Sequence, residues 1–233
     1  IEADLDAVQE QIGIPCIFLS GTLEDMADTF RILGSLLDGK KDKAEEIASF
    51  IDATIEMASA NKAKIQESEV VSLMFSSASQ GLGTNAKGSS QAKVLDIVGV
   101  KNAIELETTS NKGGGSLINM EQLYNFDPDV IVFAESKVYE TVGSDATWQN
   151  LKAIKNNKYY LVPEQPYNWL SNPPSLNMVL GIWWLGNLVY PQYYDYDMAQ
   201  VAKDVYKLFW DYELTDAEVS QMLENSIVKS KNQ

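Results

Sequence analysis

The apolar positions of residues 1–40 follow helical spacing on both sides of one short apolar run. Spacing by three and four predicts a helix over 5–12. The run 14–19, Ile-Pro-Cys-Ile-Phe-Leu, predicts a buried strand. After it, Thr22 is a suitable N-cap for a helix over 23–37. Because a single parallel strand has nothing to pair with, these residues form a β–α unit or only the last part of one.

The longest uninterrupted helical pattern runs over 41–65 and contains neither Gly nor Pro. At 1.5 Å per residue such a helix is roughly 36 Å long, and a helix of that length usually leaves one packing unit and enters another. We therefore expect 41–66 to connect two units. The first unit is 1–40, with a strand and a helix, and the second is an α/β lobe over 67–233.

From residue 67 onward the hydrophobic period changes repeatedly between that of a strand and that of a helix. The segments with strand character are 70–75, 103–106, 129–134 and 158–162. The segments with helical character are 91–98, 119–126, 138–142, 148–154, 174–188, 198–210 and 215–223. This order predicts an α/β fold: a three-layer lobe around a parallel or mixed sheet, preceded by the long helix.

Composition excludes several classes of protein. Hydrophobic residues make up 45% and charged residues 22% of the 233 positions, which rules out wholesale disorder. The net charge of −15 is the opposite of what phosphate binding needs, so we expect no nucleic-acid partner. The absence of histidine removes Ser–His–Asp and Cys–His catalysis and His-ligated zinc. The one cysteine, Cys16, excludes an internal disulfide and a Cys-based metal cluster, and its apolar neighbours predict a core thiol.

Candidate ligand-binding residues follow the predicted strands, because ligands of open α/β sheets collect beyond the carboxyl ends of the strands. The loop 76–90 carries glycines, hydroxyls, an amide and a lysine, and its candidates are Thr84, Asn85 and Lys87. This composition is typical of a cradle for an oxyanion or another polar ligand, and equally of a solvated loop. Its spacing does not match a P-loop.

The loop after the last predicted strand is the more specific candidate. Tyr167, Asn168 and Trp169 are consecutive and flanked by prolines, which stiffen the backbone. Exposed rings on a rigid loop predict an aromatic wall with a hydrogen-bonding amide, although the rings could instead pack on a neighbouring helix as core. Ser171 in the same loop, and Glu135 directly after the third predicted strand, complete the candidate set.

Other prominent residues allow a structural explanation. The aromatic residues of 183–212 have helical spacing, so we interpret them as packing between helices. The glycine-rich segment 112–116 is a weak ligand-contacting candidate. Glu121 lies in the first turn of the predicted helix 119–126, where a carboxylate favours the helix dipole. It could equally be presented to a cationic partner, and the sequence leaves both interpretations open.

Several passages resemble one known family. Residues 12–15, Ile-Gly-Ile-Pro, and 32–34, Ile-Leu-Gly, look like the end of its N-terminal lobe. Residues 119–132 resemble its Glu-x-Leu and Pro-Asp-x-Ile signature, and 148–163 with the aromatic loop resembles its last strand and ligand wall. The chain thereby resembles the ABC-importer substrate-binding proteins whose two lobes are joined by a single long helix, and it would be the C-terminal lobe with a remnant of the N-terminal one.

The resemblance implies most of the functional expectations. Members of the family carry ferric siderophores, haem, cobalamin or, in some branches, molybdate and tungstate. It implies a ligand held between two lobes and delivered to an ABC permease dimer, no cofactor, and a periplasmic location or a lipoprotein at the cell surface. Glu121 would be the carboxylate that docks on a permease arginine. The rest of the N-terminal lobe would lie upstream of residue 1, where any signal would also be.

The sequence orders the possible ligands without deciding between them. The only arginine is Arg31, so an anionic chelate would be bound by Lys87, backbone amides and the aromatic loop, or by the other lobe. An iron compound such as a siderophore or haem is the first expectation, and a molybdate or tungstate oxyanion is the alternative. A non-transport interaction domain is a further possibility. An enzyme on this scaffold would need ligating His or Cys, which the chain lacks apart from Cys16.

Overall fold

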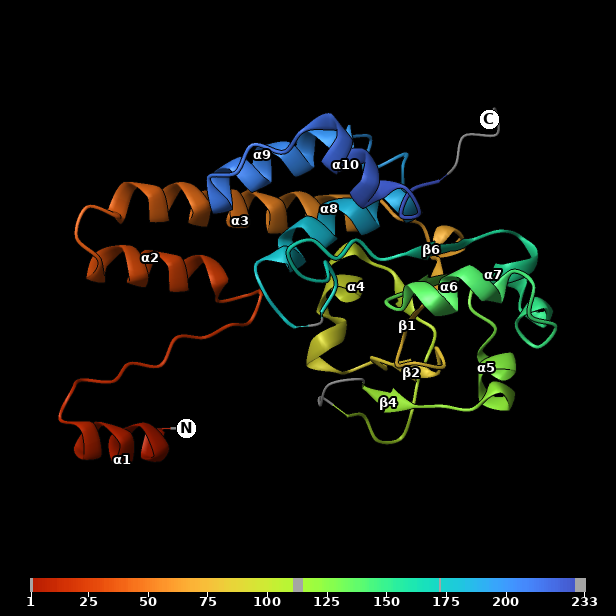
Figure 1. Ribbon diagram of the computed structural model, residues 1–233, viewed down its shortest axis with the longest axis horizontal. Coiled ribbons are helices and arrows are strands. Elements are labelled where there is room, and N and C mark those ends of the chain that lie inside the picture. The colour runs from red at the N-terminus through yellow and green to blue at the C-terminus, as the bar shows by residue number, and fades with distance from the viewer. Residues whose placement is uncertain (1, 111–114, 172, 229–233) are drawn as a thin grey trace. The chain divides into compact units, whose positions relative to one another are not determined.

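The computed structural model describes residues 2–110, 115–171 and 173–228 (Figure 1). The chain divides into two compact units, Ile1–Ile51 and Asp52–Gln233. The division falls inside α3 (Lys41–Lys62), so the long helix that the sequence predicts is confirmed. Its role as a connector between two lobes stays a prediction.

The first unit is helical. It contains α1 (Glu2–Ile12), α2 (Met26–Leu36) and the first part of α3. Gly34 lies where α2 passes α3, because a Cβ built on it would be 2.4 Å from the Cβ of Ala44. A larger residue at this position would push the two helices apart.

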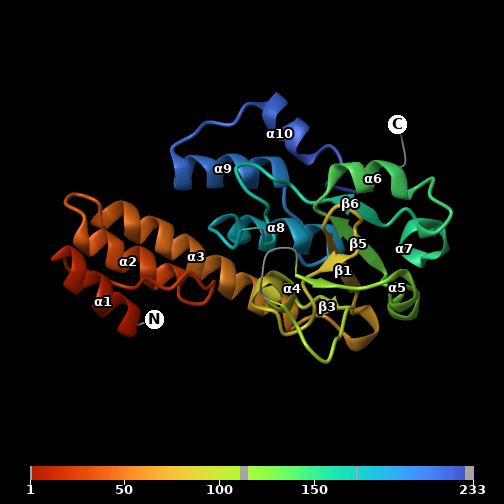
Figure 2. The same ribbon diagram turned by 60° about the horizontal axis from the view of Figure 1, so that its bottom comes forward.

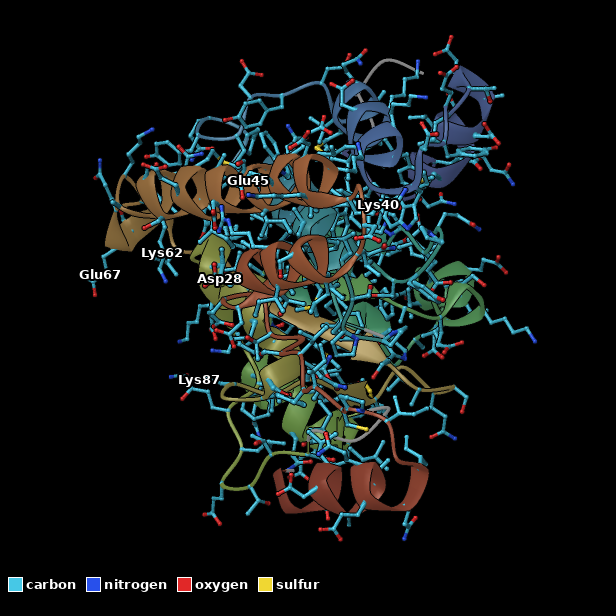
Figure 3. The ribbon with its side chains drawn as sticks, turned by 90° about the vertical axis from the view of Figure 1, so that its left-hand side faces the viewer. Asp28, Lys40, Glu45, Lys62, Glu67 and Lys87 are labelled. Carbon is cyan, nitrogen blue, oxygen red and sulfur yellow. The ribbon has the colours of Figure 1, made fainter. Side chains whose placement is uncertain are left out.

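An exposed ion-pair group also joins these helices. The Arg31 guanidinium on α2 lies 3.2 Å from Asp28 one turn earlier and 3.1 Å from Glu45 on α3. Figure 3 labels the two carboxylates, Asp28 on α2 and Glu45 on α3. Its side chains are partly or largely exposed, so the group contributes little to stability. The only arginine of the chain is therefore engaged within this unit.

The predicted strand over 14–19 is wrong. Ile14, Ile17 and Phe18 are 61%, 56% and 59% exposed, and the described residues of this unit include no strand. A strand needs a partner to satisfy its backbone groups, and an apolar run without one stays irregular. Cys16 is accordingly half-buried and not the core thiol that its neighbours predict.

The second unit is built on a mixed sheet, which confirms the α/β class. The strands are β1 (Ser72–Ser77), β2 (Gly83–Thr84), β3 (Lys101–Asn102), β4 (Ser116–Leu117), β5 (Val130–Phe133) and β6 (Tyr159–Leu161). Their order is β4-β2-β1-β5-β6, with β3 also paired to β1. The pairs β1–β5, β5–β6 and β1–β3 are parallel, whereas β1–β2 and β2–β4 are antiparallel. The carboxyl ends of β1, β5 and β6 therefore lie along the same edge.

Helices cover both faces of this sheet. They are α4 (Lys93–Val98), α5 (Met120–Phe126), α6 (Ser136–Val142), α7 (Lys152–Lys155), α8 (Asn177–Val189), α9 (Met198–Trp210) and α10 (Asp216–Leu223). Figure 2 shows the sheet between α5, α6 and α7 on one side and α4 and α8 on the other. α9 packs on α8, and α10 packs on α9. The three-layer prediction is confirmed.

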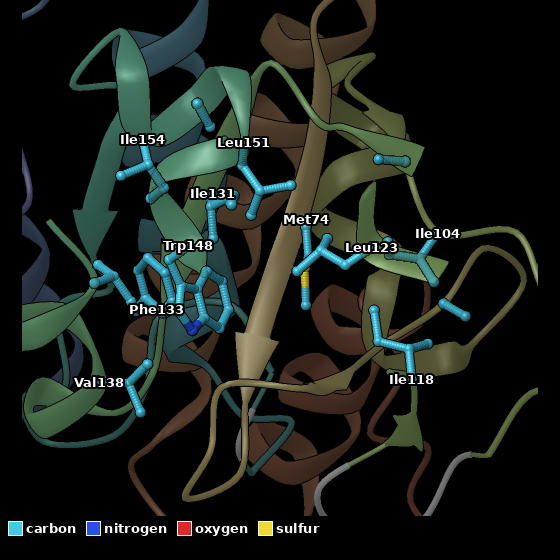
Figure 4. Packing of buried hydrophobic residues seen from close by; sticks show 14 residues of the cluster. Met74, Ile104, Ile118, Leu123, Ile131, Phe133, Val138, Trp148, Leu151 and Ile154 are labelled. Atoms are coloured by element: carbon cyan, nitrogen blue, oxygen red, sulfur yellow. The ribbon is translucent and has the colours of Figure 1, made fainter. Parts of the chain in front are cut away.

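The core under α5, α6 and α7 follows from the alternation of the strands. Met74, Ile131 and Phe133 point to this face and are fully buried in one cluster (Figure 4). Trp148 lies edge-on to Phe133, with ring centroids 5.5 Å apart. Burial of such large apolar side chains is the main term that stabilises the lobe.

The second half of α3 belongs to the opposite layer. The Trp183 indole on α8 donates to the Thr54 hydroxyl at 3.1 Å, and the Tyr194 hydroxyl reaches the carbonyl of Ala58 at 3.4 Å. Lys62 donates to the carbonyl of Asp96 on α4 at 2.6 Å. The aromatic residues after 183 thus serve packing, as their spacing predicts.

Most predicted elements of this unit are present, with two differences. The short strand β3 is Lys101–Asn102, so the predicted strand 103–106 is wrong, and Ile104 instead lies in the core. β2 and β4 are unpredicted because each is only a residue pair without a periodic pattern. Within the predicted loop 112–116, residues 112–114 lie outside the described residues, and Ser116 begins β4.

Asp129 ties the start of β5 to the start of β1. Its Oδ2 accepts from the Ser72 N–H at 2.8 Å and from the Ser72 hydroxyl at 2.6 Å, and its Oδ1 lies 3.0 Å from Lys152 Nζ. Burial acts to raise the pKa of Asp129, but the hydrogen bonds from Ser72 and Lys152 outweigh it and hold that pKa below its usual value. The ionised carboxylate therefore stabilises the fold.

Asp129→Asn should lower the free energy of unfolding by about 1–2 kcal/mol at neutral pH, since it weakens charge-assisted hydrogen bonds. A carboxyl whose pKa is lowered on folding stabilises above its unfolded pKa, and this stabilisation disappears as pH falls through the folded pKa. The cost of the substitution should therefore shrink in acid, as urea unfolding near pH 7 and near pH 3 would measure. The exposed Asp195→Asn is the control. An equal cost of Asp129→Asn at both pH values would contradict the assignment.

Candidate ligand-binding site

The carboxyl edge of β1, β5 and β6 gathers most of the residues that the sequence singles out. β1 ends at the buried Ser77, and β2 brings Thr84 back alongside Ser76. Glu135 follows β5 at the start of α6, and the loop 163–175 follows β6. This is the edge at which ligands of open α/β sheets are expected.

A hydrogen bond joins the two loops that were predicted separately. The Asn85 Nδ2 donates to the Ser171 Oγ at 2.7 Å, although the residues are 86 positions apart. The Asn85 carbonyl in turn accepts from Asn102 Nδ2 at 2.7 Å, which fixes the turn after β2. Thr84, Asn85 and Ser171 are all fully buried or nearly so. The two candidate loops therefore meet at one place, and their role in ligand binding stays a prediction.

Asn168 organises the second loop. Its Oδ1 accepts from the N–H of Leu170 at 2.9 Å and from the N–H of Ser171 at 3.2 Å, which closes a tight turn. The side chain is 4% exposed, so it is positioned by the fold and not by solvent. We call Thr84, Asn85, Asn168 and Ser171 the polar cluster.

The polar cluster holds buried polar atoms without a hydrogen-bond partner among the described residues. These atoms are Thr84 Oγ1, Asn85 Oδ1 and Asn168 Nδ2. An unpaired buried polar group costs about 1–3 kcal/mol, so a bound water or ligand that pairs with it is favoured. The cluster therefore has free hydrogen-bonding capacity where a ligand is expected.

Trp169 is not part of an exposed aromatic wall, and that prediction is wrong for this residue. Its side chain is 0% exposed, and its indole N–H donates to the Gln165 carbonyl at 2.9 Å. The same carbonyl accepts from Asn177 Nδ2 at 3.3 Å and from the Tyr206 hydroxyl. The loop folds onto α8 and α9 and buries the ring, so Tyr167, which is 54% exposed, is the aromatic residue that remains available.

The predicted charged candidates lie outside the polar cluster. Lys87 is exposed and forms an ion pair with Glu105 at 3.1 Å, so its charge is partly neutralised (Figure 3). Glu135 is exposed at the start of α6. Glu121 is exposed in the first turn of α5, where it can favour the helix dipole and remain accessible to a partner. The structure thus separates the neutral donors from the charges around them.

Glu164 is a residue of this edge that the sequence interpretation missed. Partial burial raises the pKa of Glu164, and the nearby Glu135 raises it further. The Asn168 amide opposes the shift without forming a hydrogen bond of standard geometry. Its position in the loop that follows the last strand is the only signal in the sequence, and a single glutamate beside prolines is common in loops.

The described residues were also compared with the requirements of a membrane-spanning helix and of a metal site. Within the described ranges, no helix has the length and apolar character that crossing a bilayer requires. Over the same ranges, His, Cys, Asp and Glu side chains do not form a group of three or more suited to a metal ion.

The sequence matches one known protein family over most of its length. The family described as "Periplasmic binding protein" matches residues 3–166, which is more than half of the chain. The chain belongs to the periplasmic binding protein family. This is a family of solute-binding proteins of ABC transporters, which is not an enzyme class.

Individual periplasmic binding proteins are similar over most of the chain. An ABC transporter solute-binding protein from Sulfurospirillum deleyianum superimposes with a TM-score of 0.84 at 28% identity, over 93% of this chain and 67% of that one. A periplasmic solute-binding protein from Veillonella parvula gives a TM-score of 0.77 at 26% identity, over 97% of this chain and 68% of that one. These matches confirm the expected family and fold.

One curated relative bears the name of its ligand. The molybdate-binding protein MolA from Haemophilus influenzae is 26% identical over 136 residues, which are 57% of this chain and 37% of MolA. The molybdate-bound MolA structure superimposes with a TM-score of 0.66 at 20% identity, over 83% of this chain and 58% of that one. The chain thus spans well under two thirds of the length of MolA.

Proposed function

We propose that this chain supplies part of the ligand site of an ABC-importer binding protein, and that its ligand is an oxyanion of the molybdate or tungstate type. The observation that carries the proposal is the polar cluster, with unpaired hydroxyl and amide groups at the carboxyl edge of the sheet. The similarity to MolA supports the same class of ligand. Binding and delivery by the whole protein are part of the proposal.

Neutral donors are suited to an oxyanion that must be bound and later released. The Thr84 hydroxyl and the Asn168 amide can each donate to a charged oxygen, and such hydrogen bonds contribute about 1.5–3 kcal/mol each. Because the donors are already buried, their own desolvation is largely complete before the ligand arrives. Binding then needs no arginine, and this unit has none.

An iron compound is the second candidate, and the carboxylates of the edge favour it. Glu135 and Glu164 lie close enough for Glu135 to raise the pKa of Glu164. Such a pair repels anions, whether a free oxyanion or an anionic chelate, so the iron compound that it favours is a ferric complex of net positive charge. If this candidate holds, Glu135→Gln should weaken binding of a ferric chelate and strengthen binding of molybdate.

Replacement of Thr84 by valine should separate stability from binding. Thr84→Val removes an unpaired buried hydroxyl at nearly constant shape, so the free protein should gain about 1 kcal/mol of stability. Molybdate binding should weaken about tenfold, because a loss of about 1.4 kcal/mol corresponds to that factor. Calorimetric titration with molybdate, tungstate, sulfate, a ferric hydroxamate and haem measures the affinity, and thermal unfolding measures the stability.

Two further variants serve as controls for this experiment. Thr84→Ser keeps the hydroxyl and should keep the affinity. Asn168→Asp keeps the oxygen that accepts from Leu170 and Ser171 but replaces the free amide by a carboxylate, so it should abolish oxyanion binding while the turn survives. Unchanged molybdate affinity in both Thr84→Val and Asn168→Asp would show that the cluster is structural. Saturable binding of only the ferric probes would favour the second candidate.

Delivery to a membrane permease is proposed to involve Glu121, whose carboxylate is exposed on α5. In the complete protein, Glu121→Gln should leave ligand affinity unchanged and lower uptake several-fold, because it removes a charge that a permease arginine can bind. Radioactive ligand uptake in cells measures this effect, with Glu140→Gln on α6 as the control. Equal uptake by both variants would restrict Glu121 to its role at the helix terminus.

We also propose that the protein lies outside the cytoplasmic membrane, free or lipid-anchored.

A further inference from the structure

A cavity lies beside the start of the loop that follows β6. Its volume is about 470 Å³, and it lies between the chain leaving β6 and the helices α9 and α10. The loop side contributes Pro163, Glu164 and Gln165, and the helix side contributes Tyr206 and Met222. The volume suits a small organic molecule.

The charge of this cavity has one sign. None of the described residues that line it is basic, and its carboxylates are Glu164 and Glu218. Glu218 is already engaged, because it accepts from the Tyr212 hydroxyl at 2.6 Å and from the Thr215 N–H and hydroxyl at 2.8 Å each. None of the ion pairs that the structure records involves Glu164; the like-charged Glu135 acts to raise its pKa, and the neutral Asn168 side chain interacts with its carboxylate. A cation in the cavity would therefore meet one carboxylate whose negative charge is not balanced by a recorded ion pair.

The rest of the lining is suited to an apolar body attached to that cation. Leu161, Val162 and Leu214 supply aliphatic surface, and the partly exposed Tyr212 supplies an aromatic ring at the rim. Aromatic rings attract ammonium groups through their faces, and aliphatic walls favour hydrocarbon. We propose that this cavity binds a small organic ammonium ion, with its charge on Glu164 and its hydrocarbon part against the floor of the cavity.

This site adjoins the polar cluster, because the Glu164 carboxylate interacts with the Asn168 side chain. The Gln165 carbonyl accepts from the Tyr206 hydroxyl beside the cavity and from the indole N–H of Trp169. Trp169 directly follows Asn168 of the polar cluster. Filling the cavity would therefore hold the loop in its present conformation. The site itself can be tested without any ligand of the importer.

The probe is 2-phenylethylamine, with 2-phenylethanol as a neutral molecule of nearly the same shape. Calorimetric titration at neutral pH should give saturable binding of the amine and at least about tenfold weaker binding of the alcohol. Glu164→Gln should weaken amine binding about tenfold. Glu140→Gln, exposed on α6 and outside the lining, changes the net charge equally and should have no effect. Gln221→Trp, at an exposed lining residue, should fill the cavity and abolish binding without removing a core side chain.

Several results would overturn the proposal. Equal binding of the amine and the alcohol would show an apolar cavity without selection for charge. Equal weakening by Glu164→Gln and Glu140→Gln would show general attraction to an acidic protein. Unchanged amine binding in Gln221→Trp would place the amine elsewhere, and no saturable binding at millimolar amine would show that the cavity is no site. These results are obtained with the amine and the alcohol alone, so they are distinguishable from the outcome of the molybdate titrations of Thr84→Val.

Discussion

Replacement of Trp169 by alanine should lower the free energy of unfolding by about 3–5 kcal/mol, the range observed when a buried aromatic residue is truncated in a core. The ring is fully buried, its indole N–H donates to the Gln165 carbonyl at 2.9 Å, and its backbone N–H donates to the Pro163 carbonyl at 3.0 Å. The substitution leaves a cavity and loosens the loop at the same time. Urea unfolding followed by circular dichroism measures the loss.

Tyr167→Ala is the matched control, since this aromatic residue lies two positions away in the same loop but is 54% exposed. It should change stability by no more than about 0.5 kcal/mol. Trp169→Phe should fall in between, at about 1–2 kcal/mol, because a ring remains and the Gln165 carbonyl keeps Asn177 and Tyr206 as donors. Equal losses in Tyr167→Ala and Trp169→Ala would contradict the packing described here.

Replacement of Gly181 by alanine should destabilise the protein by about 2–3 kcal/mol and lower its melting temperature by roughly 5–10 °C. A Cβ at this position would lie 1.9 Å from the Trp169 carbonyl oxygen and 3.0 Å from its carbon. Alanine is a better helix former than glycine by about 1 kcal/mol, which acts in the opposite direction. The clash outweighs this gain because the obstacle is backbone and cannot rotate away.

Gly21→Ala provides the comparison for this substitution. A Cβ on Gly21 would have no neighbour within 4 Å, and its φ is not in the left-handed region. We therefore expect a change within about 0.5 kcal/mol of the wild-type stability. Thermal unfolding of both variants tests the argument, and a stabilised Gly181→Ala protein would show that α8 and the loop separate at low cost.

The burial of Trp169 changes how a binding experiment should be interpreted. The ring is fully buried and its indole N–H is paired with the Gln165 carbonyl, so in this conformation it offers a ligand no free hydrogen-bonding group. Emission from Trp169 would then report a change in the loop that carries Asn168 and Ser171, and not a direct contact with the ligand. Calorimetry is therefore the more direct measurement of affinity.

The sequence predicts the elements whose signal is local. The helix α9 has the bounds that its apolar spacing predicts, and β1, β5 and β6 lie where buried apolar runs predict strands. The end of α4 at Gly99, with φ +86°, is another local feature. Such signals survive because the period of a side-chain pattern is set by the backbone within a few residues. The family resemblance rests on the same local passages and is confirmed.

Tertiary structure alone decided the rest. The run 14–19 has the composition of a strand but no partner in its unit, so composition could not make it one. Lys87 stays a candidate for ligand charge, but its ion pair with Glu105, 18 positions away, is visible only in the structure. Trp169 lies in a polar, proline-rich loop, and its burial follows from the packing of that loop against α8, where a Cβ on Gly181 would lie 1.9 Å from the Trp169 carbonyl oxygen. The meeting of Asn85 with Ser171 across 86 residues was likewise invisible in the sequence, because burial and hydrogen-bond partners depend on which distant segment covers a residue.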